Sequence, residues 1–183
     1  MRVTGGKLKG RRLYTGKIKG LRPSSEKIRE AIFNILTPFL TGDAVLDLFA
    51  GTGSLGIEAL SRGMEEGVFV ECNSAVIALL KKNIEGCQLS NQAEILKIPV
   101  SKALRVLKAR EKKFKLIFLD PPYQERLVEK TLLELNKAEI LISEGIIVAE
   151  HFIKEAVGEI YGKLRIIDRR QYGQSVVSFF FLW

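Results

Sequence analysis

The sequence contains little cysteine and histidine and no long apolar run. Its 183 residues include two cysteines, Cys72 and Cys87, and one histidine, His151. Such a set excludes a disulfide framework and argues against a metal site. A membrane-spanning helix needs about 20 consecutive apolar residues, and the first residues lack the apolar core of a signal peptide. We therefore expect a cytoplasmic protein that binds no metal and, because no segment suggests an obligate interface, a monomer.

Positive charge is concentrated near the N-terminus. Residues 1–29 contain ten Lys or Arg and one acid, Glu26, whereas the whole chain carries a net charge of +8. The rest of the chain is therefore nearly neutral, and the high isoelectric point comes from this one segment. Localised positive charge is typical of a polyanion-binding surface such as one for nucleic acid. The alternative is a solvated tail that improves solubility.

The spacing of glycines and apolar residues divides the chain into two parts. Residues 1–23 carry glycines between basic residues and short β-type pairs, which predicts a basic N-terminal arm or hairpin that would carry the contact with a polyanion. Residues 24–183 form the main domain. They begin with a helix over 24–40, because a serine and Glu26 precede apolar residues at i, i+3, i+4 and i+7.

The main domain alternates short apolar runs with helical stretches. We predict strands near 44–49, 67–71, 93–98, 115–120 and 146–150, and helices near 54–62, 73–85, 101–110 and 125–136. Such alternation indicates an α/β fold with a parallel sheet covered on both faces. After His151 the pattern changes to two strand-like runs, 164–168 and 176–182, joined through Tyr172-Gly173-Gln174, which predicts a terminal antiparallel hairpin.

A glycine-rich turn follows the first predicted strand. Gly51, Gly53 and Gly56 match the dinucleotide-binding pattern G-x-G-x-x-G. Asp47 lies just before this turn, where a carboxylate would repel a pyrophosphate but suits a cofactor with a cationic end. S-adenosylmethionine has both a sulfonium and an ammonium group. Glu71 ends the next predicted strand, where an acid accepts hydrogen bonds from the two ribose hydroxyls. If each residue is considered alone, Asp47 can be interpreted as a cap of the turn and Glu71 as a solvated strand end. The two acids together predict an S-adenosylmethionine site.

Asp120-Pro121-Pro122-Tyr123 follows the apolar run 115–119. An exocyclic amino group of a nucleobase is a poor nucleophile because its lone pair is conjugated with the ring. The Asp120 carboxylate and the Pro121 carbonyl would accept its two N–H bonds, and Pro122 stiffens the backbone before the substrate arrives. Tyr123 would stack on the base. A Pro-Pro turn that only ends a strand is the alternative for these prolines. The four residues together resemble the motif of amino-group methyltransferases acting on nucleobases.

Nearly the whole chain resembles one family, the bacterial 16S rRNA (guanine(966)-N2)-methyltransferases of the RsmD type. The specific part of the resemblance is N-terminal and consists of the strings GGKLKGRRL, residues 5–13, and LRPSSEKIREAIFNIL, residues 21–36. DLFAGTG at 47–53, DPPY at 120–123 and Tyr172-Gly173 agree with it. The resemblance implies a Rossmann-like class I S-adenosylmethionine-dependent methyltransferase fold with a seven-stranded, mostly parallel sheet whose last strand is inserted antiparallel. It also implies a flipped guanine in 16S ribosomal RNA of the small ribosomal subunit as the substrate, in an assembled particle.

The motifs and the resemblance together predict three sets of site residues. The catalytic set is Asp120, Pro121, Pro122 and Tyr123. The cofactor-binding set is Asp47, Phe49, Ala50, Gly51, Thr52, Gly53, Gly56, Glu71, Cys72, Val100 and Ser101. The RNA-binding set is Lys7, Lys9, Arg11, Arg12, Arg22, Lys27 and Arg29.

One departure from the family pattern concerns the adenine of the cofactor. Relatives have an acid or amide after the third strand that meets the adenine amino group, but this chain has Ile98-Pro99-Val100-Ser101 there. Proline offers neither a side-chain acceptor nor an N–H group. The contact with adenine then depends on the backbone of Val100 or on Ser101.

Three other functions fit parts of the sequence. A DNA adenine-N6 or cytosine-N4 methyltransferase shares both catalytic motifs, but such enzymes add a target-recognition region that is not visible here. A non-catalytic RNA-binding assembly factor would share the fold, but has no need of an intact Asp-Pro-Pro-Tyr loop. An NAD-dependent oxidoreductase is disfavoured by Asp47 and by the lack of a hydride-site acid or base around His151.

Overall fold

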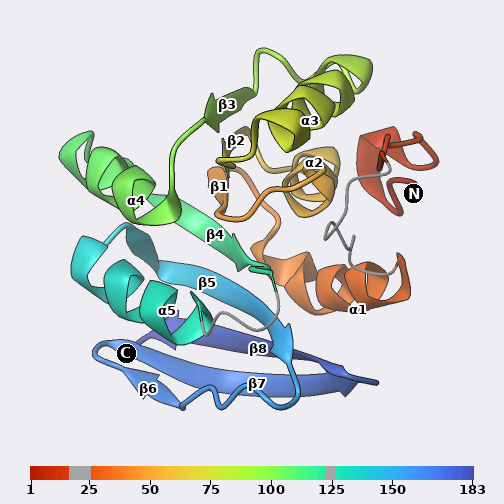
Figure 1. Cartoon of the computed structure of the whole chain (residues 1–183). Helices are drawn as coiled ribbons and strands as arrows, with labels where there is room; N and C mark the ends of the chain where they lie inside the picture. The colour runs from red at the N-terminus through yellow and green to blue at the C-terminus, as the bar shows by residue number, and fades with distance from the viewer. Residues whose placement is uncertain (17–25, 123–126) are drawn as a thin grey trace.

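The computed structural model describes residues 1–16, 26–122 and 127–183. In this part of the chain an eight-stranded sheet, in the order β3-β2-β1-β4-β5-β8-β7-β6, forms the centre of the molecule (Figure 1). The strands are β1 (Ala44–Asp47), β2 (Glu66–Val70), β3 (Ala93–Leu96), β4 (Phe114–Leu119), β5 (Leu141–Phe152), β6 (Ile160–Tyr161), β7 (Leu164–Tyr172) and β8 (Ser175–Leu182).

The parallel and antiparallel halves of the sheet follow the predicted pattern. β3, β2, β1, β4 and β5 pair in parallel, whereas β8 pairs antiparallel with both β5 and β7. The terminal hairpin is thus confirmed, and its last strand is inserted between β5 and β7 as the resemblance implied. Eight strands replace the predicted seven because β6 adds a two-residue strand to the edge of β7.

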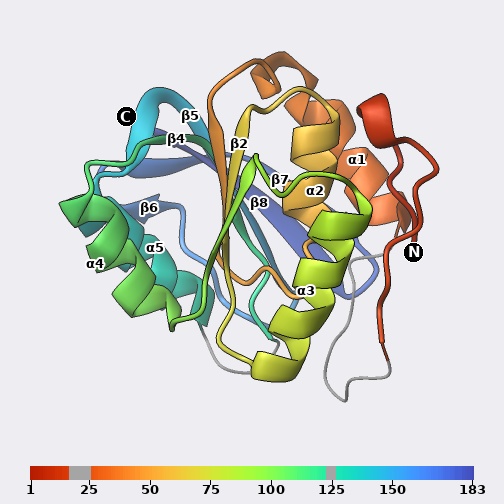
Figure 2. The same ribbon diagram turned by 90° about the horizontal axis from the view of Figure 1, so that it is seen from above.

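Helices cover both faces of the sheet (Figure 2). They are α1 (Glu26–Leu36), α2 (Ser54–Ser61), α3 (Ser74–Gly86), α4 (Val100–Ala109) and α5 (Leu127–Ala138), with short 3₁₀ helices η1 (Gly6–Leu8) and η2 (Thr37–Phe39). Alternate strand residues point to opposite faces. Val45 and Phe118 therefore pack with α1, α2 and α3, while Leu46 and Ile117 pack with α4 and α5. The predicted two-faced α/β architecture is confirmed.

The N-terminal residues are packed on the domain. Arg2 and Arg12 form an antiparallel bridge, and Val3 N–H donates to the Arg11 carbonyl at 2.9 Å, so the segment turns back on itself as a hairpin. Val3 and Leu13 are buried in the core cluster beneath α1 and α2. The predicted end of this segment at residue 23 lies outside the described residues. Among those described, no helix is long and apolar enough to cross a membrane.

Candidate active site

The glycine turn connects β1 with α2. Gly51 and Gly53 have positive φ angles of 52° and 80°, a region that L side chains rarely adopt. Gly56 serves packing, because a Cβ there would lie 2.3 Å from the ring of Phe69 in β2. The three glycines therefore let the chain turn sharply and bring α2 close to the sheet. This arrangement leaves the start of α2 facing the carboxyl edge of the strands.

Asp47 lies under the start of α2 and is almost fully buried. Its Oδ2 accepts a hydrogen bond from Gly56 N–H at 3.1 Å, whereas its Oδ1 is buried without a hydrogen-bond partner among the described residues. Burial raises the pKa of Asp47 to about 7; the Gly56 hydrogen bond lowers it, and nearby Glu71 raises it further. The carboxylate therefore has one oxygen that caps the helix and one oxygen that is buried without a partner among the described residues.

Glu71 connects the glycine turn after β1 with the loop after β2, at the carboxyl edge of the sheet. Its Oε2 accepts from Gly51 N–H at 3.2 Å, and its Oε1 accepts from Cys72 N–H at 2.8 Å and from Asn73 N–H at 2.9 Å. Each carboxylate oxygen can accept more than one hydrogen bond, so room for hydroxyl donors remains. The side chain fixes the glycine turn relative to the start of α3.

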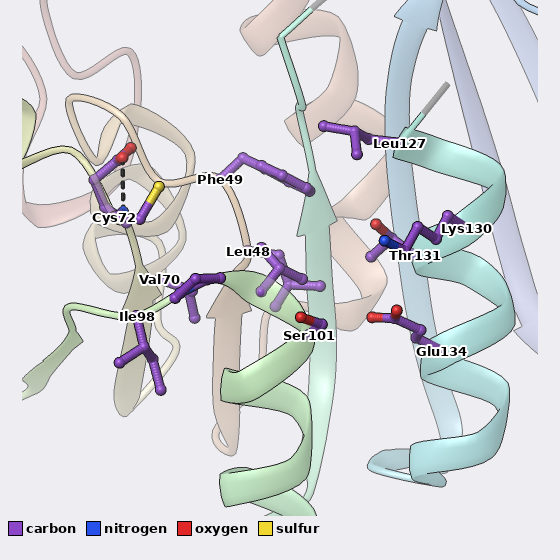
Figure 3. A pocket seen from close by; sticks show the side chains of 13 residues that line it. Leu48, Phe49, Val70, Cys72, Ile98, Ser101, Leu127, Lys130, Thr131 and Glu134 are labelled. Atoms are coloured by element: carbon purple, nitrogen blue, oxygen red, sulfur yellow. Dashed lines mark hydrogen bonds between the residues drawn. The ribbon is translucent and has the colours of Figure 1, made fainter. Parts of the chain in front are cut away.

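A cavity of about 230 Å³ opens beside these loops, between α4 and α5 (Figure 3). Five of the predicted cofactor residues line it, namely Phe49, Glu71, Cys72, Val100 and Ser101. The structure thus brings together residues from the ends of β1 and β2 and from the start of α4. The other predicted cofactor residues (Asp47, Ala50, Gly51, Thr52, Gly53 and Gly56) belong to the turn beside the cavity and do not line it. Thr52 is buried, and its carbonyl accepts from Asn83 Nδ2 at 2.8 Å.

The remaining cavity wall was not predicted from the sequence. It consists of Leu48, Val70, Ile98, Pro99, Leu127, Lys130, Thr131 and Glu134. A signal for the α5 part exists: Thr131 occupies a position in the helical stripe of Val128, Leu132 and Leu135, and a polar residue within a buried stripe indicates a special environment.

The Asp-Pro-Pro segment begins where β4 ends. β4 pairs directly with β1, with Asp47 opposite Phe118, and Leu48 N–H donates to the Phe118 carbonyl at 3.1 Å. Asp120 is half-buried, Pro121 is buried and Pro122 is exposed. The segment therefore starts at the strand end adjacent to the glycine turn. Tyr123 lies outside the described residues.

A basic groove of about 750 Å³ runs along the N-terminal hairpin. Four predicted RNA contacts line it, namely Lys7, Lys9, Arg11 and Arg12, together with Tyr14 and two residues at the end of α3. All four are exposed, as is Lys27 in the first turn of α1. Their charge faces solvent, as a phosphate-binding surface requires. Arg22 lies outside the described residues.

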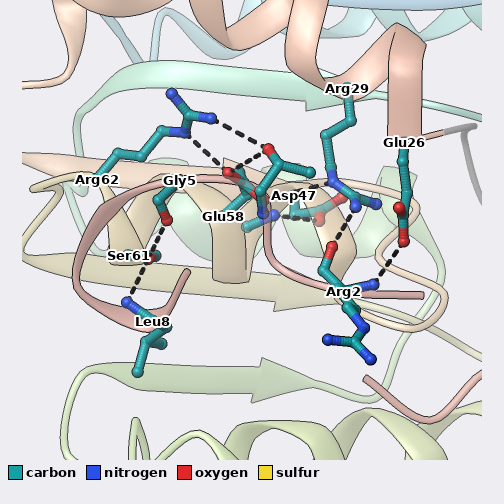
Figure 4. A network of polar contacts seen from close by, with 11 residues as sticks. Arg2, Gly5, Leu8, Glu26, Arg29, Asp47, Glu58, Ser61 and Arg62 are labelled. Atoms are coloured by element: carbon teal, nitrogen blue, oxygen red, sulfur yellow. Dashed lines mark hydrogen bonds and ion pairs between the residues drawn. The ribbon is translucent and has the colours of Figure 1, made fainter. Parts of the chain in front are cut away.

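The prediction for Arg29 is wrong. Its side chain is fully buried, forms an ion pair with Glu58 of α2 at 3.4 Å, and donates from Nη2 to the Arg2 carbonyl. Figure 4 shows this guanidinium enclosed between the N-terminal hairpin and α2. Burial lowers the pKa of Arg29, and the Glu58 carboxylate opposes this effect. Arg29 is therefore a structural cation with no surface available to RNA.

Comparison with known proteins agrees with the fold. A family model described as "Conserved hypothetical protein 95" matches residues 1–181. YlbH of Bacillus subtilis (strain 168) is 38% identical over 180 residues, covering 98% of each chain. "Ribosomal RNA small subunit methyltransferase D" of Escherichia coli (strain K12) is 32% identical over 174 residues, 95% of this chain and 86% of that protein. The solved structure of yhhF from Escherichia coli superposes with a TM-score of 0.87 at 27% identity, covering 100% of this chain and 97% of that one. The chain therefore belongs to this family, the RsmD family of bacterial methyltransferases.

Proposed function

We propose that this protein transfers a methyl group to the exocyclic N2 of guanine 966 in 16S ribosomal RNA, within the assembled small subunit. The observation that best supports the proposal is the pairing of β1 with β4, which sets the glycine turn beside Asp120 and Pro121. A cofactor at the turn and an amino group held by Asp120 then meet at one edge of the sheet. Open α/β sheets bind ligands at this edge.

The cofactor is S-adenosylmethionine, and the residues at this edge fit it. When bound, it would supply a methyl group attached to a sulfonium, and the neutral thioether formed on transfer is a good leaving group. The unpartnered Oδ1 of Asp47 suits the ammonium of the methionine part. Glu71 at one end of the cavity suits the ribose hydroxyls, and the apolar walls formed by Val70 and Ile98 suit the adenine ring.

The target nitrogen is held by Asp120 and Pro121. Their two acceptors would bind both N–H groups and turn the nitrogen lone pair out of conjugation. Because the leaving group is already activated, the protein contributes mainly positioning and electrostatics. The transferred methyl group replaces a proton on N2, and that proton leaves after transfer, when the methylated nitrogen is acidic.

The RNA is held by the basic groove of the hairpin. Turning a base out of its stack costs roughly a few kcal/mol. Phosphate contacts from Lys7, Lys9, Arg11 and Arg12 would offset this cost, since these exposed side chains share one groove. Lys27 and Arg22 remain proposed RNA contacts.

The first test identifies the methylated nucleoside. Labelled S-adenosylmethionine is incubated with the protein and, separately, with small subunits lacking the modification, with naked 16S ribosomal RNA and with DNA. We expect label in N2-methylguanosine at position 966, and most of it in assembled subunits. Label in a DNA base, or in another ribosomal nucleotide, would contradict the proposed substrate, and no label in any sample would contradict the proposed activity.

The second prediction concerns pH. The pKa of Asp47 is raised above its unfolded value of about 4, so protonation stabilises the cofactor-free protein fully below about pH 4, and this contribution is lost as the pH rises to about 7. A cationic ligand needs the ionised form. We therefore expect S-adenosylhomocysteine, which keeps the ammonium, to bind about eightfold more weakly at pH 6 than at pH 7.5 in calorimetric titrations.

An Asp47→Asn variant is the control for this pH dependence. Its amide oxygen still accepts from Gly56 N–H, but it does not titrate. Its affinity should be weaker and nearly constant from pH 6 to 7.5. An equally steep pH dependence in the variant would assign the titration to another group.

A further inference from the structure

The loop after β3 offers the cofactor's adenine no side-chain acceptor. Pro99 is the N-cap residue of α4 and makes no side-chain capping bond, while Ile98 and Val100 present apolar side chains to the cavity. The adenine amino group carries two N–H donors, and burying them unpaired is costly. Apart from the neutral Ser101 hydroxyl at the start of α4, an acceptor must therefore come from another wall of the cavity.

The facing wall is α5, which lines the cavity with the polar side chains of Lys130, Thr131 and Glu134, and only the last two of these can accept a hydrogen bond. Thr131 is 3% exposed, lines the cavity, and has no hydrogen-bond partner among the described residues. Glu134 is half-buried, lines the same cavity, and forms no hydrogen bond or ion pair within the described part of the chain. Figure 3 shows the Glu134 carboxylate extending from α5 toward Ser101 in α4. Both side chains line the cavity, where a bound ligand could reach them.

The first turn of α4 supplies the complementary donors. Lys102 and Ala103 N–H both donate to the Pro99 carbonyl, whereas the N–H groups of Val100 and Ser101 precede the first helical hydrogen bonds. Adenine presents one ring acceptor, N1, next to its amino group. A backbone N–H on α4 can donate to N1, and a carboxylate on α5 can accept from the amino group. A base with a carbonyl and an N–H at these two positions would place acceptor against acceptor and donor against donor.

We propose that Glu134 recognises the adenine amino group of the cofactor, with Thr131 beside it and the Val100 or Ser101 N–H at N1. Helix α5 thus supplies the side-chain acceptor that the loop after β3 lacks. This inference rests on the proposed cofactor, whose base would extend from a ribose at Glu71 toward the α4–α5 side of the cavity. Glu134 is a specificity-determining residue that takes no part in the methyl transfer.

The test compares two ligands that differ at the amino group. S-adenosylhomocysteine and S-inosylhomocysteine, in which a carbonyl oxygen replaces the amino group, are titrated calorimetrically into the parent protein and into Glu134→Gln. A hydrogen bond to a charged acceptor is a strong one, so the parent should prefer the adenine ligand by about tenfold or more. In Glu134→Gln the preference should shrink to within about threefold, because an amide both accepts and donates.

The matched control is Glu129→Gln, which removes one charge from an exposed position on the same helix that does not line the cavity. It should keep the parental preference, and both variants should keep the parental melting temperature. An unchanged preference in Glu134→Gln, or a parent that binds both ligands equally, overturns the role of Glu134 while the proposed function stands. A parent that binds neither ligand overturns the cofactor assignment together with this inference.

Discussion

An Asp120→Ala variant is expected to lose methyl transfer while it keeps the affinity for S-adenosylhomocysteine within roughly threefold. Asp120 begins the segment beside the glycine turn and does not line the cavity between α4 and α5. Its proposed role is therefore at the target amino group and not at the cofactor. Removing one preorganised group that stabilises developing charge lowers turnover by about 10²–10³-fold, and single-turnover rates on RNA measure this directly.

Two further variants define the role of Asp120. Asp120→Asn keeps one acceptor oxygen but loses the charge, so its rate should lie between those of the parent and the alanine variant. Asp168→Ala removes a carboxylate that pairs with Arg170 on β7, two strands beyond β5, and should keep the parental rate. Parental turnover in Asp120→Ala would refute the assignment. A loss of cofactor affinity as large as the loss of rate would place Asp120 in the cofactor site.

Local sequence patterns predicted most of the elements. β1, β2 and β4, for example, lie within a residue or two of the predicted runs, because a strand buried on both faces is a continuous apolar segment bounded by turns. β5 was predicted to begin near residue 146 but begins at Leu141. Ser143, Glu144 and Gly145 interrupt its apolar pattern, and the pairing register with β4 shifts between Phe114 and Leu116. Such an irregularity depends on the neighbouring strand and leaves no local signature.

The candidate site was predicted only where its residues share a motif. Phe49, Glu71 and Cys72 were predicted from strand ends, and they line the cavity. Thr131 and Glu134 follow no motif, since their place depends on the packing of α5 against α4, two elements that the strand order brings together. Spacing along one helix marks Thr131 as a polar residue in a buried stripe, but it does not show which helix packs opposite.

Arg29 shows how composition misled the prediction. It was counted with the basic N-terminal residues, yet it precedes Ile32, Phe33 and Leu36 by three, four and seven positions, which is the spacing of the buried stripe of α1. Helical periodicity therefore predicts that Arg29 is buried. Charge alone does not distinguish an RNA contact from a buried ion pair.

A Glu58→Ala variant is expected to be strongly destabilised. Glu58 is fully buried, and its two oxygens accept from Thr4 N–H and Thr4 Oγ1, each at 2.8 Å, pair with Arg62 at 2.8 Å, and contact Arg29 at 3.4 Å. The variant leaves the Arg29 cation buried without a carboxylate, because arginine does not release its proton in proteins. Removing one partner of a buried pair costs about 3–5 kcal/mol, which lowers the melting temperature of a chain of this size by on the order of 10 °C.

The control for Glu58 is an exposed pair of the same residue types. Arg110 and Glu94 approach to 2.7 Å with both side chains largely exposed, so Glu94→Ala should cost at most about 1 kcal/mol in urea unfolding. The double variant Arg29→Met with Glu58→Leu removes both buried charges and should recover much of the stability, because the loss in the single variant comes from an unpaired cation. It also removes the acceptors that hold Thr4, so amide exchange in residues 2–4 should remain faster than in the parent. Equal stability losses for Glu58→Ala and Glu94→Ala would show that the buried carboxylate does not secure the hairpin to α2.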